Sequence, residues 1–125
     1  MKNYLFIILI TTSLCATANP GKSLSSTQFV QLPGSMTEIR YFYPEGSLMQ
    51  IGYMENGVKT GEWITYNREG NITAKAYYDH GKKVGKWKIY NDAGEVVYKI
   101  QYRDGKKIWA QQYDAEGNTI AFNYK

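Results

Sequence analysis

The chain repeats itself with a period of about 24 residues, and this period constrains the fold more than any other feature of the sequence. Two sets of glycines follow it: Gly46, Gly70, Gly94 and Gly117, and then Gly57, Gly81 and Gly105. The intervals within each set are equal, except that the last interval of the first set is shorter by one position. Trp63 and Trp87 are separated by the same interval, as are Gly61 and Gly85. The sequence therefore predicts stacked copies of one supersecondary unit.

Each unit has the sequence of a β-hairpin. The longer turns are Asn67–Gly70, Asn91–Gly94 and Asp114–Gly117. They open with Asn or Asp, whose side chain can bond the backbone two residues on, and they close with a glycine that tolerates positive φ. Pro44-Glu45-Gly46 is predicted to form the same turn, with Pro fixing φ. The shorter turns are Asn56-Gly57, His80-Gly81 and Asp104-Gly105, which are typical of two-residue hairpin loops.

These signals predict an all-β fold, an up-and-down antiparallel meander of stacked hairpins in a single elongated sheet. We expect eight strands from Glu38 to Tyr124, forming a repeat domain of about 3.5 units over residues 38–125. Residues 19–37 are expected to be an irregular leader, with one short strand around Gln28–Leu32. Gly61 and Gly85 fall inside strands, where we expect a neighbouring aromatic ring to lie flat over the bare backbone.

Two stretches carry a more specific pattern: a tyrosine, a turn glycine, then Gly-x-Trp-x-x-Tyr and another turn glycine. The first runs from Tyr53 to Gly70 and the second from Tyr77 to Gly94. This pattern resembles the MORN repeat in its bacterial variant form. A third copy, Tyr102–Gly117, is degenerate, because the second glycine is missing, Trp109 is displaced by one position and the unit is one residue shorter. A leading half-copy covers Phe42–Gly46.

The resemblance implies a scaffold or protein-interaction surface, since MORN-type repeats usually have such roles. In some eukaryotic members the repeats are linked to membrane association, and some bacterial relatives carry an antitoxin label. A protein partner is therefore expected. The family offers no catalytic residues that could be carried over to this chain.

Residues 1–18 have the sequence of a secretory signal. Lys2 precedes the apolar run Tyr4–Ile10, and Ala16-Thr17-Ala18 supplies small residues for cleavage before Asn19. Cys15 is a poor lipoprotein site, because Thr12 and Leu14 stand where a lipobox has an aliphatic and a small residue. We therefore expect a periplasmic or secreted protein, whose mature chain starts at Asn19 and contains no cysteine.

The formal net charge is +4 for the full chain. The basic residues are interspersed with acids, apart from Lys82-Lys83 with Lys86 and Lys88, and Lys106-Lys107. A mild, mixed excess of this kind is typical of a solvated sheet surface, and together with the export signal it argues against nucleic-acid binding.

The sequence provides little for catalysis. His80, the only histidine, lies in a short turn and fits there as a residue that tolerates positive φ. No cluster of Cys or His could hold a transition metal, and the glycine spacing is explained by turns and not by a phosphate loop. We expect a protein that is not an enzyme and that has no cofactor.

Aromatic residues are the best candidates for binding, since Phe, Trp and Tyr make up 15% of the chain and such side chains are enriched at interfaces. We expect one face to carry Trp63 and Trp87 as an aromatic patch, and we expect five residues to bind a partner: Trp63, Tyr66, Trp87, Tyr90 and Trp109. The favoured hypothesis is an exported protein-interaction module of the inhibitor, immunity or antitoxin type. The alternative is an envelope-associated structural module that binds lipid or glycan through basic and aromatic residues.

Overall fold

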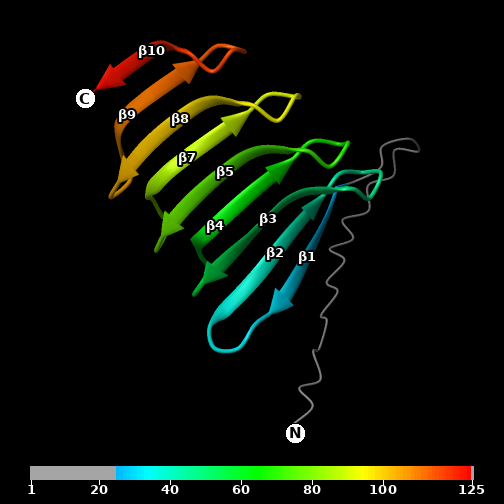
Figure 1. Cartoon of the computed structure of the whole chain (residues 1–125). Coiled ribbons are helices and arrows are strands. Elements are labelled where there is room, and N and C mark those ends of the chain that lie inside the picture. Colours follow the sequence, from blue (N-terminus) through cyan, green and yellow to red (C-terminus); the bar gives the residue numbers. More distant parts are fainter. Residues whose placement is uncertain (1–24, 125) are drawn as a thin grey trace, which may run out of the picture.

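The structure is a computed structural model that describes residues 25–124, and the predicted signal segment and Cys15 lie outside this range. The described chain forms one sheet of ten strands (Figure 1). The strands are β1 (Ser26–Gln31), β2 (Met36–Phe42), β3 (Leu48–Glu55), β4 (Val58–Tyr66), β5 (Ile72–Asp79), β6 (Lys82–Lys83), β7 (Gly85–Tyr90), β8 (Val96–Arg103), β9 (Lys106–Tyr113) and β10 (Thr119–Tyr124).

The strands follow one another across the sheet in sequence order, and every pair is antiparallel. The two-residue strand β6 pairs only with β5, and Val84 separates it from β7. The predicted all-β meander in a single sheet is confirmed. The eight strands expected after Glu38 are β2–β5 and β7–β10, with β6 as an interruption before β7.

The sheet begins earlier in the chain than residue 38. The strand expected around Gln28–Leu32 is β1, and it pairs along its whole length with β2, which itself starts at Met36. The second half of the expected leader is therefore part of the sheet. Phe29, Val30 and their neighbours have the alternation and the β-branched and aromatic content of an edge strand.

The short turns form as predicted. Both residues of each turn have positive φ: 49° and 80° at Asn56-Gly57, 46° and 82° at His80-Gly81, and 52° and 79° at Asp104-Gly105. This backbone twist matches the twist of the flanking strands.

The longer turns also form, but their side chains bond further along the chain than expected. Asn67 Oδ1 accepts a hydrogen bond of 2.9 Å from the backbone N–H of Asn71, four residues on instead of two. Asn91 and Asp114 repeat this bond, to Glu95 and Asn118. The bonded residue lies beyond the turn glycine, because the positive φ of that glycine brings it back beside the first residue.

The explanation expected for Gly61 and Gly85 is wrong. A β-carbon at either position would meet the nearest ring or side-chain atoms at ordinary contact distance, 3.8 Å from Tyr53 and 3.7 Å from Tyr77. What requires glycine there is the backbone, because φ is +65° at Gly61 and +69° at Gly85. In β4 this conformation lies in a bulge, since Gly61–Trp63 stand between residues that pair with Tyr53 and Ile51.

The glycine that does lie under a ring is Gly52 in β3. A β-carbon there would overlap the six-membered ring of Trp63. Trp63 is 1% exposed and Ile39, which pairs with Gly52, is 2% exposed; they are the only buried hydrophobic side chains in the described chain. The core is therefore small and lies on one face of β2–β4.

Candidate binding faces

The two faces of the sheet carry different side chains. Residues directly opposite one another in an antiparallel pair project to the same face, and successive residues project to opposite faces. We call the face that holds Trp63, Tyr78, Trp87 and Tyr102 the tryptophan face. We call the opposite one, which holds Lys75, Lys88 and Lys99, the lysine face.

Four rings form a continuous row on the tryptophan face. Trp63 meets Tyr78 edge-on with centroids 6.2 Å apart, Tyr78 lies 5.3 Å from Trp87, and Trp87 lies 4.7 Å from Tyr102. Burial raises the pKa of the Tyr78 hydroxyl, with a smaller contribution from Tyr102. Contacts of this kind stabilise a sheet by about 0.5–1.5 kcal/mol per pair beyond the area they bury.

Lysines cover this row at equivalent positions of successive repeats. Lys59 Nζ lies 4.3 Å from the Trp63 ring and 5.0 Å from Tyr78, and Lys83 Nζ lies 5.0 Å from Trp87 and 5.3 Å from Tyr102. The indole N–H of Trp63 donates to the Tyr53 carbonyl at 3.1 Å. Trp87 makes the equivalent bond to Tyr77 at 3.1 Å. The indole N–H groups and the lysine ammonium groups therefore have partners within the fold, and the row of rings stabilises the sheet itself.

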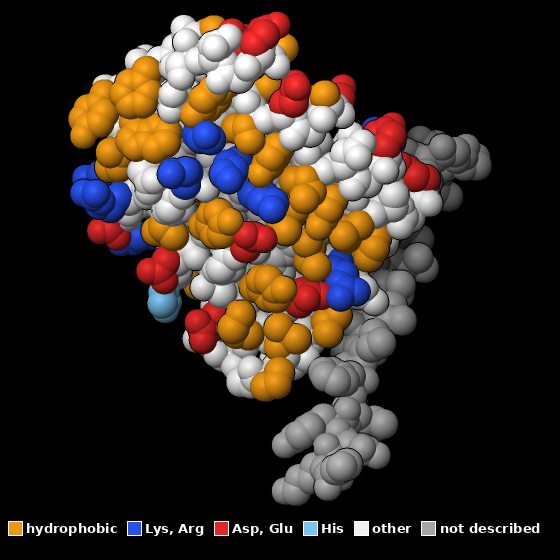
Figure 2. All heavy atoms as spheres, viewed as in Figure 1, with side chains coloured by type: hydrophobic (Ala, Val, Ile, Leu, Met, Phe, Trp, Pro, Cys, Tyr) orange, Lys and Arg blue, Asp and Glu red, His pale blue; other side chains and the backbone are white. Residues whose placement is uncertain are grey.

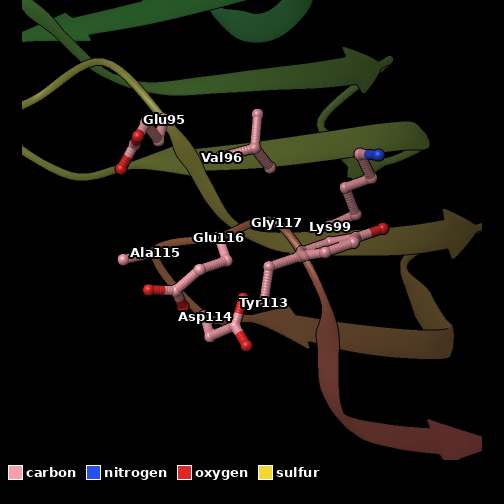
Figure 3. A pocket seen from close by; sticks show the side chains of 8 residues that line it. All are labelled: Glu95, Val96, Lys99, Tyr113, Asp114, Ala115, Glu116 and Gly117. Carbon is pink, nitrogen blue, oxygen red and sulfur yellow. The ribbon is translucent and has the colours of Figure 1, made fainter.

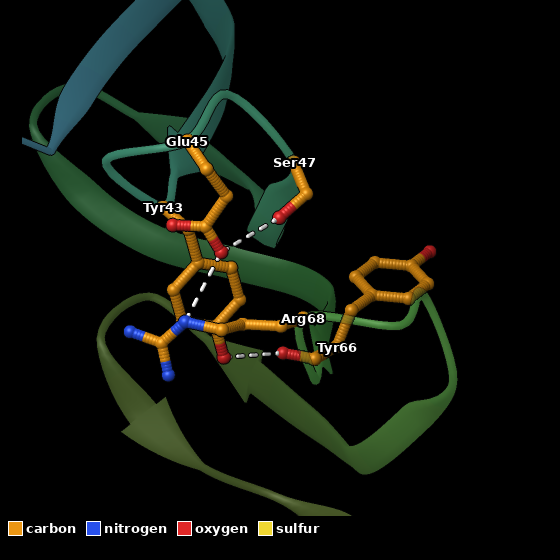
Figure 4. A network of polar contacts seen from close by, with 5 residues as sticks. All are labelled: Tyr43, Glu45, Ser47, Tyr66 and Arg68. Carbon is orange, nitrogen blue, oxygen red and sulfur yellow. Dashed lines mark hydrogen bonds and ion pairs between the residues drawn. The ribbon is translucent and has the colours of Figure 1, made fainter.

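Backbone bonds join the second and third short turns to the repeat before each of them. The N–H of Gly81 donates to the Lys59 carbonyl at 2.8 Å, and the N–H of Gly105 donates to the Lys83 carbonyl at 2.9 Å. At the other end of the strands, the first two longer turns are joined by side chains (Figure 4). Arg68 lies 4.7 Å over the Tyr43 ring and pairs with Glu45 at 3.0 Å, while the Tyr43 hydroxyl donates to the Tyr66 carbonyl at 2.9 Å.

On the lysine face, basic side chains gather over the middle of the sheet, and hydrophobic side chains lie on both sides of them, at the end that carries β9 and β10 and over the half that carries β2–β5 (Figure 2). Lys75 pairs directly with Lys88, and Lys88 pairs directly with Lys99. The three lysines therefore stand side by side on β5, β7 and β8. The Tyr77 hydroxyl donates to Glu62 at 2.6 Å, and this bond raises the pKa of Tyr77.

Two open hollows lie beside these lysines, one in each of two successive repeats. The hollow of about 300 Å³ is lined by Glu95, Val96, Lys99, Tyr113, Asp114, Ala115, Glu116 and Gly117 (Figure 3). The other, of about 410 Å³, is lined by Gly70, Asn71, Ile72, Lys75, Tyr90, Asp92, Ala93 and Gly94. Lys99 lies over the Tyr113 ring with its Nζ 4.7 Å from the centroid. Both hollows are open to solvent and are lined largely by residues of the longer turns.

The hydrophobic end of the lysine face is a stack of three rings. Trp109 and Phe122 stack with centroids 6.0 Å apart, and Phe122 and Tyr124 follow at 6.4 Å. Phe122 is 55% exposed and Tyr124 is 75% exposed. We call Trp109, Phe122 and Tyr124 the terminal aromatic patch.

Comparison with known families identifies this architecture. The family described as the MORN repeat variant matches residues 59–81 and 83–104. The chain therefore contains two MORN repeat variants. No curated protein matches the sequence. MORN repeats are commonly non-catalytic modules that bind proteins or membranes.

Between residues 25 and 124 there is no helix long and apolar enough to cross a membrane, and there is no group of three or more His, Cys, Asp or Glu side chains that could hold a metal ion.

The five residues expected to bind a partner do not share one face of this MORN sheet. Trp63 and Trp87 lie on the tryptophan face, while Tyr66, Tyr90 and Trp109 lie on the lysine face. The binding role expected for Trp63 is wrong, because at 1% exposure its side chain offers no surface to a partner. Trp87 is only partly exposed and packs between Tyr78 and Tyr102.

The sequence pattern does not reveal the faces, because strand alternation breaks at the bulges. Trp109 pairs with Gln101, whereas Ala110 pairs with Ile100 on the tryptophan face. Displacement of the third tryptophan by one position therefore moves it to the opposite face. Phe122 and Tyr124 are not among the five expected residues, although both stand in the uncharged stretch Thr119–Tyr124, which is the available signal for an exposed apolar strand.

Proposed function

We propose that this MORN protein is a non-catalytic, exported module that binds a protein partner in stoichiometric amounts and blocks it, as an inhibitor, immunity protein or antitoxin does. The partner-binding site is the lysine face around the terminal aromatic patch. This moves the site away from Trp63 and Trp87, which the fold uses for its own packing.

The observation that carries the proposal is the exposure of the patch. Three stacked rings, two of them more than half exposed, stand together at the end of a sheet that otherwise covers most of its rings. Clustered Trp, Tyr and Phe side chains are the residues that anchor protein interfaces. A scattered exposed ring needs no such explanation, but a contiguous stack does.

Affinity capture from native cells with a tagged chain tests the proposal. Two variants test whether the partner binds at the terminal aromatic patch. Phe122→Ser/Tyr124→Ser removes the two exposed rings, and Tyr98→Ser removes a 38% exposed ring from the other face as a matched control. We expect one partner protein in near-equal amount with the wild type and with the Tyr98 variant, and at least tenfold less with the patch variant, because interface anchors contribute roughly 2 kcal/mol or more each.

Equal capture by all three proteins would overturn the assignment of the site. Light scattering of the purified chain gives a second check. A dimer that the patch variant converts to monomer would show that the patch joins two copies of this chain, and the proposal would then fail. Circular dichroism spectra of the variants identify any loss that comes from unfolding.

Export rests on the sequence of residues 1–18, with Lys2, the apolar run Tyr4–Ile10 and the small residues before Asn19. We expect the protein in the periplasm or medium of its native cells, with Asn19 as its first residue. N-terminal sequencing of the fractionated protein measures this directly. An intact Met1 in the soluble interior of the cell would contradict export, and a lipid-modified Cys15 would contradict cleavage after Ala18.

A further inference from the structure

The three lysines in the middle of the lysine face form an arrangement that the fold itself does not need. Lys75, Lys88 and Lys99 are directly cross-strand neighbours, and like charges in such positions destabilise a sheet. Within residues 25–124 none of the three forms an ion pair. By contrast, Arg40 is paired with Glu38 at 2.6 Å.

The lysines are part of one row that crosses the sheet and ends at the terminal aromatic patch. Lys99 pairs with Gln111 of β9, and Gln111 pairs with Phe122 of β10. From Lys75 to Phe122 the row crosses four strand spacings, a distance of about 19 Å. An extended peptide of about six residues has this length. The row therefore presents three cations, an amide and an exposed ring in linear order.

We propose that this row binds an acidic, extended segment of the partner protein. Its carboxylates pair with Lys75, Lys88 and Lys99, and an apolar side chain at its end packs against Phe122. The inference rests on the proposed function, since it names the chemistry of the partner at that same face. It also accounts for the row of lysines, because the ligand supplies carboxylates to three side chains that form no ion pair within residues 25–124.

The surroundings of the row favour a narrow ligand over a flat anionic surface. Asp92, Glu95, Asp114 and Glu116 stand on the turns at one rim of the same face, beside the two hollows. An anionic membrane lying across the face would approach these carboxylates as well as the lysines, whereas a single extended chain can follow the row and avoid them. A uniformly charged glycan would leave the exposed ring of Phe122 without an apolar partner.

A labelled hexapeptide of four glutamates followed by leucine and phenylalanine is the probe, and its affinity for the mature chain is measured by fluorescence polarisation at low salt. Lys75→Gln/Lys88→Gln/Lys99→Gln should weaken binding about tenfold, since three partly exposed charge pairs are lost. The control Lys82→Gln/Lys106→Gln/Lys107→Gln removes the same net charge from the short-turn end of the sheet and should change the affinity less than twofold.

The variant Lys75→Gln/Lys88→Gln/Lys99→Gln, called the ladder variant below, should also be at least as stable as the wild type. The substitutions remove the repulsion between lysines that are direct cross-strand neighbours. Equal losses in both variants would overturn the inference, since only net charge would then matter. Stronger binding to vesicles of phosphatidylcholine and phosphatidylglycerol, or to a polygalacturonate oligosaccharide, than to the peptide would also overturn it. Capture of the cellular partner separates the two proposals: a partner lost with the patch variant but kept by the ladder variant leaves the proposed function standing and removes this inference.

Discussion

The two matched repeats and the terminal hairpin use tryptophan differently. In the matched repeats Trp63 and Trp87 point to the same face, donate to a backbone carbonyl at 3.1 Å and carry a lysine over the ring. In the terminal hairpin Trp109 points to the opposite face and stacks on the exposed Phe122. The terminal unit is one residue shorter and lacks the glycine with positive φ that forms the bulge. One residue in a bulge thus decides whether a ring builds the sheet or lies at its surface.

Substitution of the three tryptophans by alanine should rank them by the role of each. Trp63→Ala should lower the free energy of unfolding by about 4 kcal/mol, because its ring is fully buried. Trp87→Ala should cost about 2 kcal/mol, since that ring is only partly covered. Trp109→Ala should cost least, about 1 kcal/mol, because that partly covered ring has the exposed Phe122 as its stacking partner. Urea denaturation measures all three, and equal costs would contradict the division between the repeats.

The contact between Gly52 and Trp63 should give the next largest effect. Gly52→Ala places a methyl group where the Trp63 ring lies and should cost about 2 kcal/mol. The equivalent residue of the second repeat is Ala76, which already has a β-carbon, so the strain is specific to the first repeat. In the double variant with Trp63→Ala the cost of Gly52→Ala should nearly vanish. Additive costs in this cycle would show that the ring is not the cause.

Exchange of Trp109 and Ala110 should move the terminal ring to the other face. Ala110 is directly opposite Ile100, which also faces Trp87, so Trp109→Ala/Ala110→Trp places the indole beside that row. The change in stability should stay within about 1 kcal/mol, because the residue composition is unchanged. Nuclear Overhauser contacts from the new indole to the Ile100 methyl groups are expected. Persistent contacts to the Phe122 ring would contradict the assignment of faces.

The smallest effect concerns the turn that closes the terminal hairpin, where Asp114 replaces the Asn67 and Asn91 of the earlier turns. The backbone N–H of Asn118 is the main cause that holds the pKa of Asp114 below its usual 3.8. A lowered pKa stabilises the turn above about pH 3.8 and the contribution is lost as the pH falls through the folded pKa. Amide exchange at Asn118 should therefore rise at low pH relative to Glu95, and Asp114→Asn should remove this difference.

The sequence was sufficient for the strands and turns because these depend on local residues. Asn-Gly, Asp-Gly and the spaced glycines determine where the chain reverses, and the regular period of the repeat determines that the hairpins stack. The assignment of side chains to faces depends on the bulges at Gly61 and Gly85, whose effect on alternation is set by backbone conformation.

For the candidate site, the sequence predicted the types of residue that bind but not their positions on the sheet. Aromatic and basic residues were the expected binders, but burial of Trp63 follows from the missing β-carbon of Gly52, which lies on another strand. The lysine ladder likewise depends on register, because Lys75, Lys88 and Lys99 have unequal spacings in the sequence and meet only through pairing of β5, β7 and β8.

The bonds from Gly81 to Lys59 and from Gly105 to Lys83 have a consequence for how the protein can change in length. At these two turns the same pair of backbone atoms forms the bond, and neither bond uses a side chain. A duplication of the codons for one repeat would therefore insert one more hairpin whose short turn can form the same backbone bond to the repeat before it. The number of hairpins, and with it the span of the exposed faces, is a property that recombination within the gene can adjust in single steps.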